Sequence, residues 1–289
     1  MTGTAPHDTT DAPVLVAAVC RDPLIGDLEA NRALAVAAVG EAAERGAGLI
    51  VLPELITSGY VFKSRHEAAS VAIDAQHELM AELAAAASGA VVVAGFCEQD
   101  EHGRLFNSAV VLEHAGVRAV YRKTHLWDRE KLVFAPGAEP PPVVETTIGR
   151  IGVLVCYDLE FPEMPRGMAL RGADIIAVPT NWPLVPRPPG EHPPEVIAAM
   201  AAARTNHVFI ACADRAGTER HIPFTGGTCL IDPEGWLIAA TPVAGLAIGS
   251  VDPMRARQKS IGPRNDVLAD RRPDLYRDWT ATREEIQLV

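Results

Sequence analysis

Short apolar runs alternate with longer amphipathic stretches in the early part of the chain. Val, Ile, Leu and Ala make up the short runs, which predict buried strands at 14–20, 47–53 and 90–97. Apolar residues recur at helical spacing between these runs and predict helices at 28–45 and 66–87. The chain therefore opens as alternating strands and helices, which is typical of an α/β fold.

Strand patterns dominate from residue 105 onward. Paired runs flank the turns at 114–116 and 232–235 and predict two hairpins. Further elements are predicted as strands at 151–155, 173–179, 207–213 and 246–251 and as helices at 162–172 and 194–206. Because no linker interrupts these elements, we expect one mixed α/β domain over residues 13–289.

Three segments depart from the regular pattern. Residues 1–12 carry no apolar core and are expected to form a disordered tail. The proline-rich stretch 183–194 follows a strand end, so we expect an extended loop at the rim of a pocket. The charged segment from about residue 252 is expected to form a C-terminal arm that packs on a neighbouring subunit.

The composition indicates a soluble protein with an acidic surface. A formal net charge of −11 argues against nucleic acid and anionic membrane as partners, because either would repel the average surface. No uncharged run is long enough to cross a membrane, and the first residues lack a secretory signal, so we expect a cytoplasmic protein with small-molecule ligands. The five cysteines contain no CxxC pair and the nine histidines show no ligand spacing, so neither a disulfide framework nor a metal site is predicted.

Three ionisable residues directly follow predicted strands: Glu54, Lys123 and Cys156. A thiol nucleophile needs a base to accept its proton, and a carbonyl substrate needs a cation or other donors where oxyanion charge develops. Taken singly, each residue has a plainer interpretation, as a solvated acid at a strand end, a surface cation and a small buried thiol. Glu130 has one too, as a partner on a charged face.

Cys156 lies between the predicted strand 151–155 and the helix that Pro162 is placed to open. A thiol held near a helix N-terminus has its thiolate favoured by the helix dipole. The turn therefore predicts an activated nucleophile displayed clear of neighbouring side chains. The other cysteines fall in or beside predicted strands and are expected to be core residues: Cys20, Cys97, Cys212 and Cys229.

Taken together, three stretches that contain these residues make the chain resemble the nitrilase superfamily of carbon–nitrogen hydrolases over roughly residues 14–275. The resemblance is carried by Leu52-Pro-Glu54 with Ser58-Gly-Tyr60, by Tyr121-Arg-Lys123-Thr-His125-Leu with Glu130, and by Val155-Cys156-Tyr-Asp-Leu-Glu-Phe-Pro-Glu163. It implies an α-β-β-α sandwich whose subunits commonly pair, so a homodimer or higher homo-oligomer is expected.

The resemblance also implies roles for the matching residues. Glu54, Lys123 and Cys156 would form the catalytic triad, with Glu54 as general base and Cys156 as nucleophile. Lys123 and the backbone N–H of Tyr157 would stabilise the oxyanion, and Glu130 would hold Lys123 or position the substrate's amide. No metal or organic cofactor is needed, and His125 would be structural.

The residues after Cys156 resemble amidase branches that act on short aliphatic or ω-amino amides. The function expected is therefore hydrolysis of a small amide to its acid and ammonia through a thioester. Two alternatives use the same triad, an N-carbamoyl amidohydrolase and a nitrilase. A non-catalytic binding or assembly protein on the same scaffold would be expected to lose a triad residue, and all three are present.

Pocket residues are predicted less directly than the triad. The candidates, drawn from the loops that follow predicted strands, are Tyr60, Trp127, Asn181, Trp182 and Asp214. Ordinary packing is an equal alternative for the two tryptophans.

Overall fold

The computed structural model describes residues 12–241 and 243–276, which include two six-stranded sheets. The first sheet has the order β14 (Gly245–Val251), β1 (Val14–Cys20), β2 (Leu49–Val51), β3 (Val91–Gln99), β4 (Leu105–Glu113) and β5 (Gly116–Arg122). The second has the order β13 (Leu237–Thr241), β12 (Thr228–Ile231), β9 (Phe209–Ala213), β8 (Ile175–Pro179), β7 (Gly149–Val153) and β6 (Val143–Thr146).

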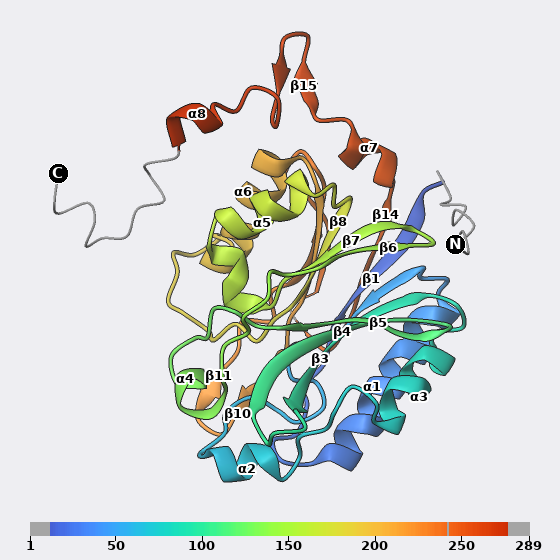
Figure 1. Cartoon of the computed structure of the whole chain (residues 1–289), viewed down its shortest axis with the longest axis vertical. Helices are drawn as coiled ribbons and strands as arrows, with labels where there is room; N and C mark the ends of the chain where they lie inside the picture. Colours follow the sequence, from blue (N-terminus) through green and yellow to red (C-terminus); the bar gives the residue numbers. More distant parts are fainter. Residues whose placement is uncertain (1–11, 242, 277–289) are drawn as a thin grey trace, which may run out of the picture.

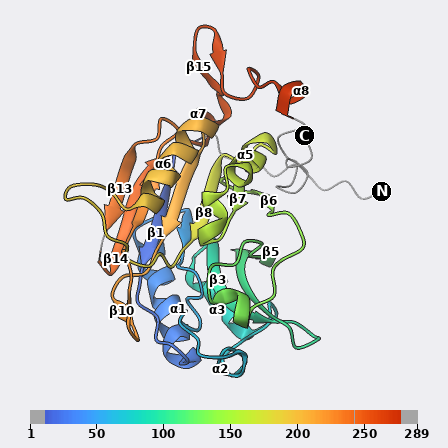
Figure 2. The ribbon, with the colours of Figure 1, turned by 90° about the vertical axis from the view of Figure 1, so that its left-hand side faces the viewer.

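Helices cover the outer face of each sheet (Figure 1). The first sheet is covered by α1 (Leu28–Glu44) and α3 (Glu78–Ala86), the second by α5 (Glu163–Leu170) and α6 (Pro194–Asn206). Between the sheets, one apolar cluster joins side chains of both, including Val51 and Val93 with Val153 and Ala177. Figure 2 shows the layers from the side. The predicted α-β-β-α sandwich is confirmed.

The single helix expected at 66–87 is wrong. The structure has the short helix α2 (Arg65–Ala69) and then α3, separated by an extended segment. Ile73 in this segment accepts a backbone hydrogen bond from Gln99 and donates one to Cys97, so its backbone pairs with the end of β3 instead of continuing a helix. Strand β6 was not predicted, because it is only four residues long and directly follows a run of prolines.

Strands of both sheets end at the same edge of the sandwich. β2 and β3 are parallel, and two successive antiparallel pairings, β3 with β4 and β4 with β5, return β5 to the same direction. In the other sheet β7, β8 and β9 are parallel. The two edges meet where the backbone N–H of Glu54 donates to the carbonyl of Thr180 at 3.4 Å. Chemical groups that follow these strands are thereby brought together, as is usual at the carboxyl ends of strands.

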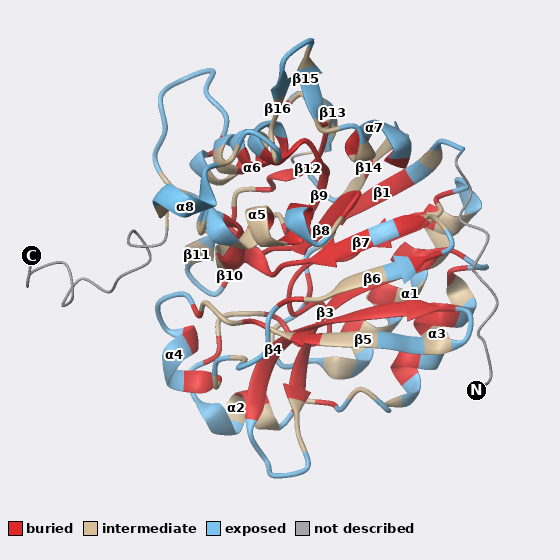
Figure 3. Cartoon of the chain, turned by 45° about the horizontal axis from the view of Figure 1, so that its top comes forward, coloured by how far each residue is buried: buried red, intermediate tan, exposed pale blue. Residues whose placement is uncertain are grey.

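Burial follows the layers (Figure 3). The central strands of both sheets are buried along their length, and exposed residues lie on the outer helix faces and in the loops. Four predicted core cysteines are buried and unpaired: Cys20, Cys97, Cys212 and Cys229. In the described residues, no helix combines the length and apolarity that crossing a membrane requires.

The segment after β14 runs along one end of the sandwich as α7 (Pro253–Arg257), β15 (Ser260–Gly262), β16 (Asn265–Asp266) and α8 (Pro273–Tyr276), as Figure 1 shows. It is attached to its own chain, because Arg257 pairs with Asp174 at 3.0 Å and Lys259 Nζ donates to the carbonyl of His207 at 2.7 Å. Packing of this arm on a neighbouring subunit stays a prediction. Residues 1–11 of the expected N-terminal tail lie outside the residues that the structure describes.

Candidate active site

Lys123 lies at the centre of a buried ion-pair network. It follows β5, and its Nζ donates to Glu54 Oε1 and to Glu130 Oε1, each at 2.8 Å. The Lys123 and Glu54 side chains are 0% exposed. Burial alone would lower the pKa of Lys123, but the two carboxylates outweigh it and raise this pKa well above its usual value. The structure thus brings three predicted residues together, with Glu54 and Glu130 both bound to the Lys123 ammonium.

Glu130 was expected in a loop, but it is the first residue of α4 (Glu130–Val133). Its backbone N–H donates to the carbonyl of Trp127 at 2.9 Å, and its Oε2 accepts the backbone N–H of Trp127 at 3.2 Å. These reciprocal bonds close a turn that starts the short helix and fix the Glu130 carboxylate toward Lys123.

The Glu54 carboxylate is held on one side only. Its Oε1 accepts from Lys123 and also from Asn107 Nδ2, at 2.6 Å, while its buried Oε2 has no hydrogen-bond partner in the described part of the chain. Asn181 Nδ2 donates to the backbone carbonyl of Glu54 at 2.8 Å. Asn107 was not predicted; the available signal was a single amide inside the apolar run 105–112.

Burial raises the pKa of Glu54 to about 7. Lys123 opposes this shift and the nearby Glu130 carboxylate adds to it. A carboxyl group with this pKa exchanges its proton near neutral pH, which suits a general base.

Cys156 lies three residues beyond the end of β7, at the start of a 3₁₀ turn, Cys156–Glu160. Its φ of +48° is in the left-handed region, which is unusual for a residue with a side chain and is often found at functional sites. Asp158 stabilises the turn: its carboxylate accepts the Val155 N–H at 3.1 Å and the Tyr121 hydroxyl at 2.8 Å. Asp158 also bonds His125 Nδ1 at 2.8 Å, which fits the structural role expected for that histidine.

The expectation that a helix dipole activates Cys156 is wrong. Helix α5 begins only at Glu163, beyond the 3₁₀ turn. Burial raises the pKa of the Cys156 thiol well above its usual value, and the Glu54 carboxylate raises it further, whereas Lys123 and the backbone N–H of Asn181 oppose the shift. The surroundings of Cys156 therefore favour its neutral thiol over the thiolate, and the Glu54 carboxylate is among the charges that act on it.

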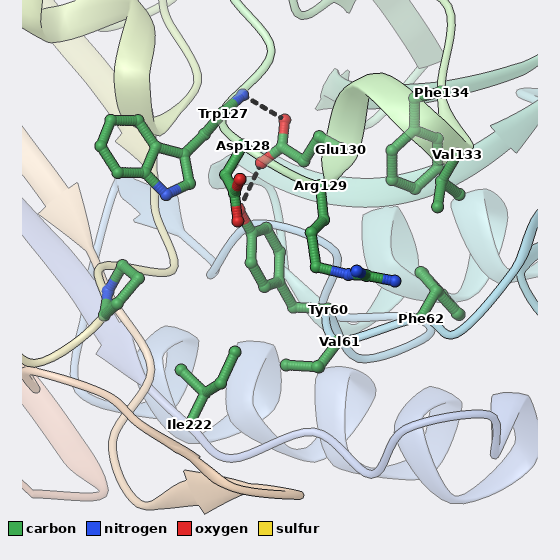
Figure 4. A pocket seen from close by; sticks show the side chains of 11 residues that line it. Tyr60, Val61, Phe62, Trp127, Asp128, Arg129, Glu130, Val133, Phe134 and Ile222 are labelled. Carbon is green, nitrogen blue, oxygen red and sulfur yellow. Dashed lines mark hydrogen bonds between the residues drawn. The ribbon is translucent and has the colours of Figure 1, made fainter.

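A cavity of about 240 Å³ borders this network (Figure 4). Tyr60 and Glu130 belong both to the cavity wall and to the network, since the Tyr60 hydroxyl donates to Glu130 Oε1 at 2.6 Å. Much of the remaining wall is apolar and consists of Val61, Phe62, Val133, Phe134, Pro183 and Ile222. From the proline-rich loop 183–194 only Pro183 lines this cavity.

Trp127 also lines the cavity and is 41% exposed. Its ring lies edge-on to that of Tyr157, with centroids 4.8 Å apart. Tyr157 itself is half-buried and is not among the cavity-lining residues.

Three predicted pocket residues do not line the cavity. Asn181 is buried against Glu54, and Trp182 is 2% exposed and packs on Gly227. Both carboxylate oxygens of Asp214 are occupied, by the backbone N–H groups of Trp182 at 2.9 Å and of Gly227 at 2.7 Å. Burial raises the pKa of Asp214 to about 7. Asn181, Trp182 and Asp214 therefore stabilise the turn after β8 and do not form the cavity wall.

Gly95 on β3 lies so close to the Glu54 loop that an added Cβ would be 2.6 Å from Glu54 Cα and 2.7 Å from the Pro53 carbonyl oxygen. Gly95→Ala is expected to push the loop away, costing about 1–3 kcal/mol of stability and about 10-fold or more in kcat/KM through misplacement of Glu54. Thermal unfolding and steady-state kinetics measure both effects. Gly40→Ala, where nothing lies within 4 Å, is the control and should keep wild-type turnover.

No group of three or more His, Cys, Asp or Glu side chains is placed to hold a metal ion within residues 12–241 and 243–276. The arrangement around Cys156 therefore consists of a thiol, a carboxyl group that titrates near neutrality and a lysine held between two carboxylates. Such a set can carry out acyl transfer, because it contains a nucleophile, a base and a cation for the oxyanion.

Comparison with known proteins places the chain in a family. The model of the carbon–nitrogen hydrolase family matches residues 15–259. A nitrilase of Pyrococcus abyssi is 35% identical, with 91% of this chain and 99% of the relative covered. An N-carbamoylputrescine amidase of Arabidopsis thaliana is 29% identical, with 87% and 90% covered. The crystal structure of an amidase from Nesterenkonia sp. superposes with a TM-score of 0.76 at 29% identity and covers 92% of this chain and 96% of that one. The chain therefore belongs to the carbon–nitrogen hydrolase family, in the amidase-like branch of the nitrilase superfamily, and is an amide-hydrolysing enzyme.

Proposed function

We propose that the protein hydrolyses a small aliphatic or ω-amino amide to its acid and ammonia, with Cys156 as the nucleophile. The observation that carries this proposal is the Glu54 carboxylate: Oε1 is bound by two donors, Oε2 is buried without a hydrogen-bond partner among the described residues, and the charge of this carboxylate acts on the Cys156 thiol. A buried acceptor in this state is ready to take a proton.

In the acylation step, Glu54 takes the Cys156 proton as the sulfur attacks the amide carbon. The carbonyl oxygen becomes an oxyanion, which the Lys123 ammonium and the backbone N–H of Tyr157 stabilise. The C–N bond then breaks, Glu54 returns the proton to the nitrogen, and ammonia leaves a thioester on Cys156. Glu130 keeps the Lys123 ammonium in place, supported by their 2.8 Å bond.

In the second step, Glu54 takes a proton from water, whose oxygen attacks the thioester carbon. The C–S bond breaks and the thiolate recovers the proton, releasing the carboxylic acid. No step needs a metal or an organic cofactor.

The cavity supports a small substrate. Its volume of about 240 Å³ and apolar wall suit a short hydrocarbon chain. The exposed Asp128, also in the lining, would accept the ammonium of an ω-amino amide. N-carbamoyl compounds and nitriles are the second candidates, because relatives named for both match this chain.

A substrate panel tests the proposal. Ammonia release is measured with short aliphatic amides, ω-amino amides, N-carbamoyl amines and matching nitriles, with hydroxylamine present in parallel reactions to trap the acyl group as a hydroxamate. We expect the amides to be turned over and to give hydroxamate. Preference for carbamoyl compounds or nitriles would replace amides by the second candidates, and absence of hydroxamate during turnover would contradict the thioester.

The pH dependence follows from Glu54. Because its pKa is about 7 and its deprotonated form is the base, kcat/KM is expected to fall about tenfold per pH unit below 7. Glu130→Gln removes a negative charge that raises this pKa, so the acid limb should move to lower pH in that variant. Profiles from pH 5 to 9 test this; a limb that moves upward, or does not move, contradicts the assignment.

We further propose a cytoplasmic homodimer or higher homo-oligomer that needs neither nucleic acid nor membrane. The acidic composition and the resemblance to oligomeric hydrolases support this. Light scattering coupled to gel filtration measures the state, and a monomeric mass at micromolar concentration would overturn it.

A further inference from the structure

Glu219 is a buried acid that none of the proposed chemical steps uses. It belongs to the two-residue strand β10 (Thr218–Glu219), which pairs with β11 (Ile222–Pro223), and it is 4% exposed. Its Oε1 accepts the backbone N–H of Tyr60 at 2.9 Å and also the backbone N–H of Val61. One carboxylate oxygen thus binds two consecutive amides from a distant part of the chain.

The other oxygen of Glu219 is bound by a buried cation. Arg215 is 1% exposed, and its Nη1 donates to Glu219 Oε2 at 2.5 Å. Its Nη2 reaches Asp22 and the Pro23 carbonyl. The guanidinium lies over the ring of Phe224, 4.4 Å from the centroid. Because Arg215 is bound from several directions, the position of Glu219 is determined by more than its own strand.

The segment that Glu219 binds has no room for a side chain at position 59. Gly59 has φ of +76°, and an added Cβ would lie 2.7 Å from Glu219 Oε2 and 2.6 Å from Ile25 Cα. The Phe224 ring meets the Tyr60 ring edge-on at 6.1 Å. The backbone and the ring of Tyr60 are therefore both held from the side of Glu219 and Arg215.

The Tyr60 hydroxyl connects this part of the chain to the proposed triad. Its hydroxyl donates to Glu130 Oε1 at 2.6 Å, and the same oxygen accepts from Lys123 Nζ at 2.8 Å. We propose that Glu219 is a positioning residue for amide hydrolysis: by binding the amides of residues 60 and 61, it places the Tyr60 hydroxyl so that Glu130 holds Lys123. This inference rests on the proposed function.

Glu219 also helps to define the cavity wall. Val61, whose N–H it binds, lines the cavity, as does Ile222 on the neighbouring strand β11. Figure 4 shows Val61, Ile222 and Tyr60 among the side chains that line the cavity. An effect of Glu219 on the cavity through Val61 does not need the Tyr60 hydroxyl, so it would appear as an equal loss with Tyr or Phe at position 60.

A double-mutant cycle tests the inference. Glu219→Ala should lower kcat/KM by about tenfold, because misplacing the Tyr60 hydroxyl cannot cost more than removing it. Tyr60→Phe should cost about tenfold, because Glu130 loses one donor. If Glu219 acts through Tyr60, Glu219→Ala should cost less than about threefold in the Tyr60→Phe background. Equal losses in both backgrounds would overturn the proposal.

Loss of the Glu219 charge removes one of the two carboxylates that pair with the buried Arg215, so Glu219→Ala could fail to fold. Glu219→Asp keeps the charge beside Arg215 but withdraws the carboxylate from the Tyr60 and Val61 amides. It should lower kcat/KM about tenfold with Tyr60 present and leave it unchanged with Phe at that position. Asp22→Ala removes another partner of Arg215 without touching residues 60 and 61, and it should stay within about threefold of wild type.

Failure of the proposed function is distinguishable from failure of this inference. If the wild type shows no amidase activity, the proposed function is wrong. The cycle is then read from the rate at which iodoacetamide, itself a small amide, alkylates Cys156, which needs no turnover. A Glu219→Asp variant that is alkylated as fast as wild type in both backgrounds would overturn the role of Glu219.

Discussion

Replacing Cys156 with alanine is expected to lower amide hydrolysis by at least about 10⁴-fold, the order seen when a nucleophile is removed. Nothing else in the network can replace the thiol, because Glu54, Lys123 and Glu130 are engaged with one another. Ammonia release at saturating amide, measured beside the wild type, checks this. The fold should persist, since only a small, 5% exposed side chain is shortened.

Cys97 supplies the matched control for this variant. It is also buried, and its thiol contacts the Ala68 carbonyl at 3.7 Å, away from Lys123 and Glu54. Cys97→Ala should keep turnover within about threefold of wild type while losing a similar volume. Activity retained in Cys156→Ala, or lost equally in both variants, would contradict nucleophilic catalysis by Cys156.

Lys123→Met is expected to be almost as severe, with kcat/KM lowered about 10⁴-fold. Loss of a donor to the oxyanion accounts for about 10²–10³ of this. The rest comes from Glu54: Lys123 lowers its pKa, so without the ammonium the carboxyl group stays protonated at pH 7 and cannot act as base. The control is Lys131→Met, the same substitution at an exposed position of α4, and it should be close to wild type.

The same variant makes a prediction about stability. Removing one partner of a buried ion pair costs about 3–5 kcal/mol, because Lys123→Met leaves Glu54 and Glu130 buried without the cation that binds both. An acid whose pKa is raised by folding destabilises the folded state more as pH rises through that pKa. Because the pKa of Glu54 is already about 7 in the wild type and rises further without Lys123, the deficit in Tm relative to wild type should grow as pH rises above 7 and shrink as pH is lowered toward 7. A deficit that grows toward acid pH would show that the carboxylates are not the cause.

Local sequence patterns are sufficient to predict most strands of the two sheets. Strands such as β1, β3 and β8 are continuous apolar runs, and burial on both faces of a strand requires that composition at every position. The segment 70–77 was misread because Ile73 has the apolar spacing of a helix, yet its backbone bonds the end of β3. That competition arises from a tertiary contact that helical periodicity cannot report.

The sequence by itself determined which residues are candidates for the chemistry: Glu54, Lys123 and Cys156 follow strands, and with Glu130 they have an order and spacing that indicate the family. Only the tertiary structure decided how they are charged and held. The raised pKa of Glu54 and the neutral Cys156 thiol depend on burial among residues far apart in the chain. Asn107, Asp158 and Glu219 act through hydrogen bonds to distant parts of the chain, and the packing of the two sheets and their loops decides those partners.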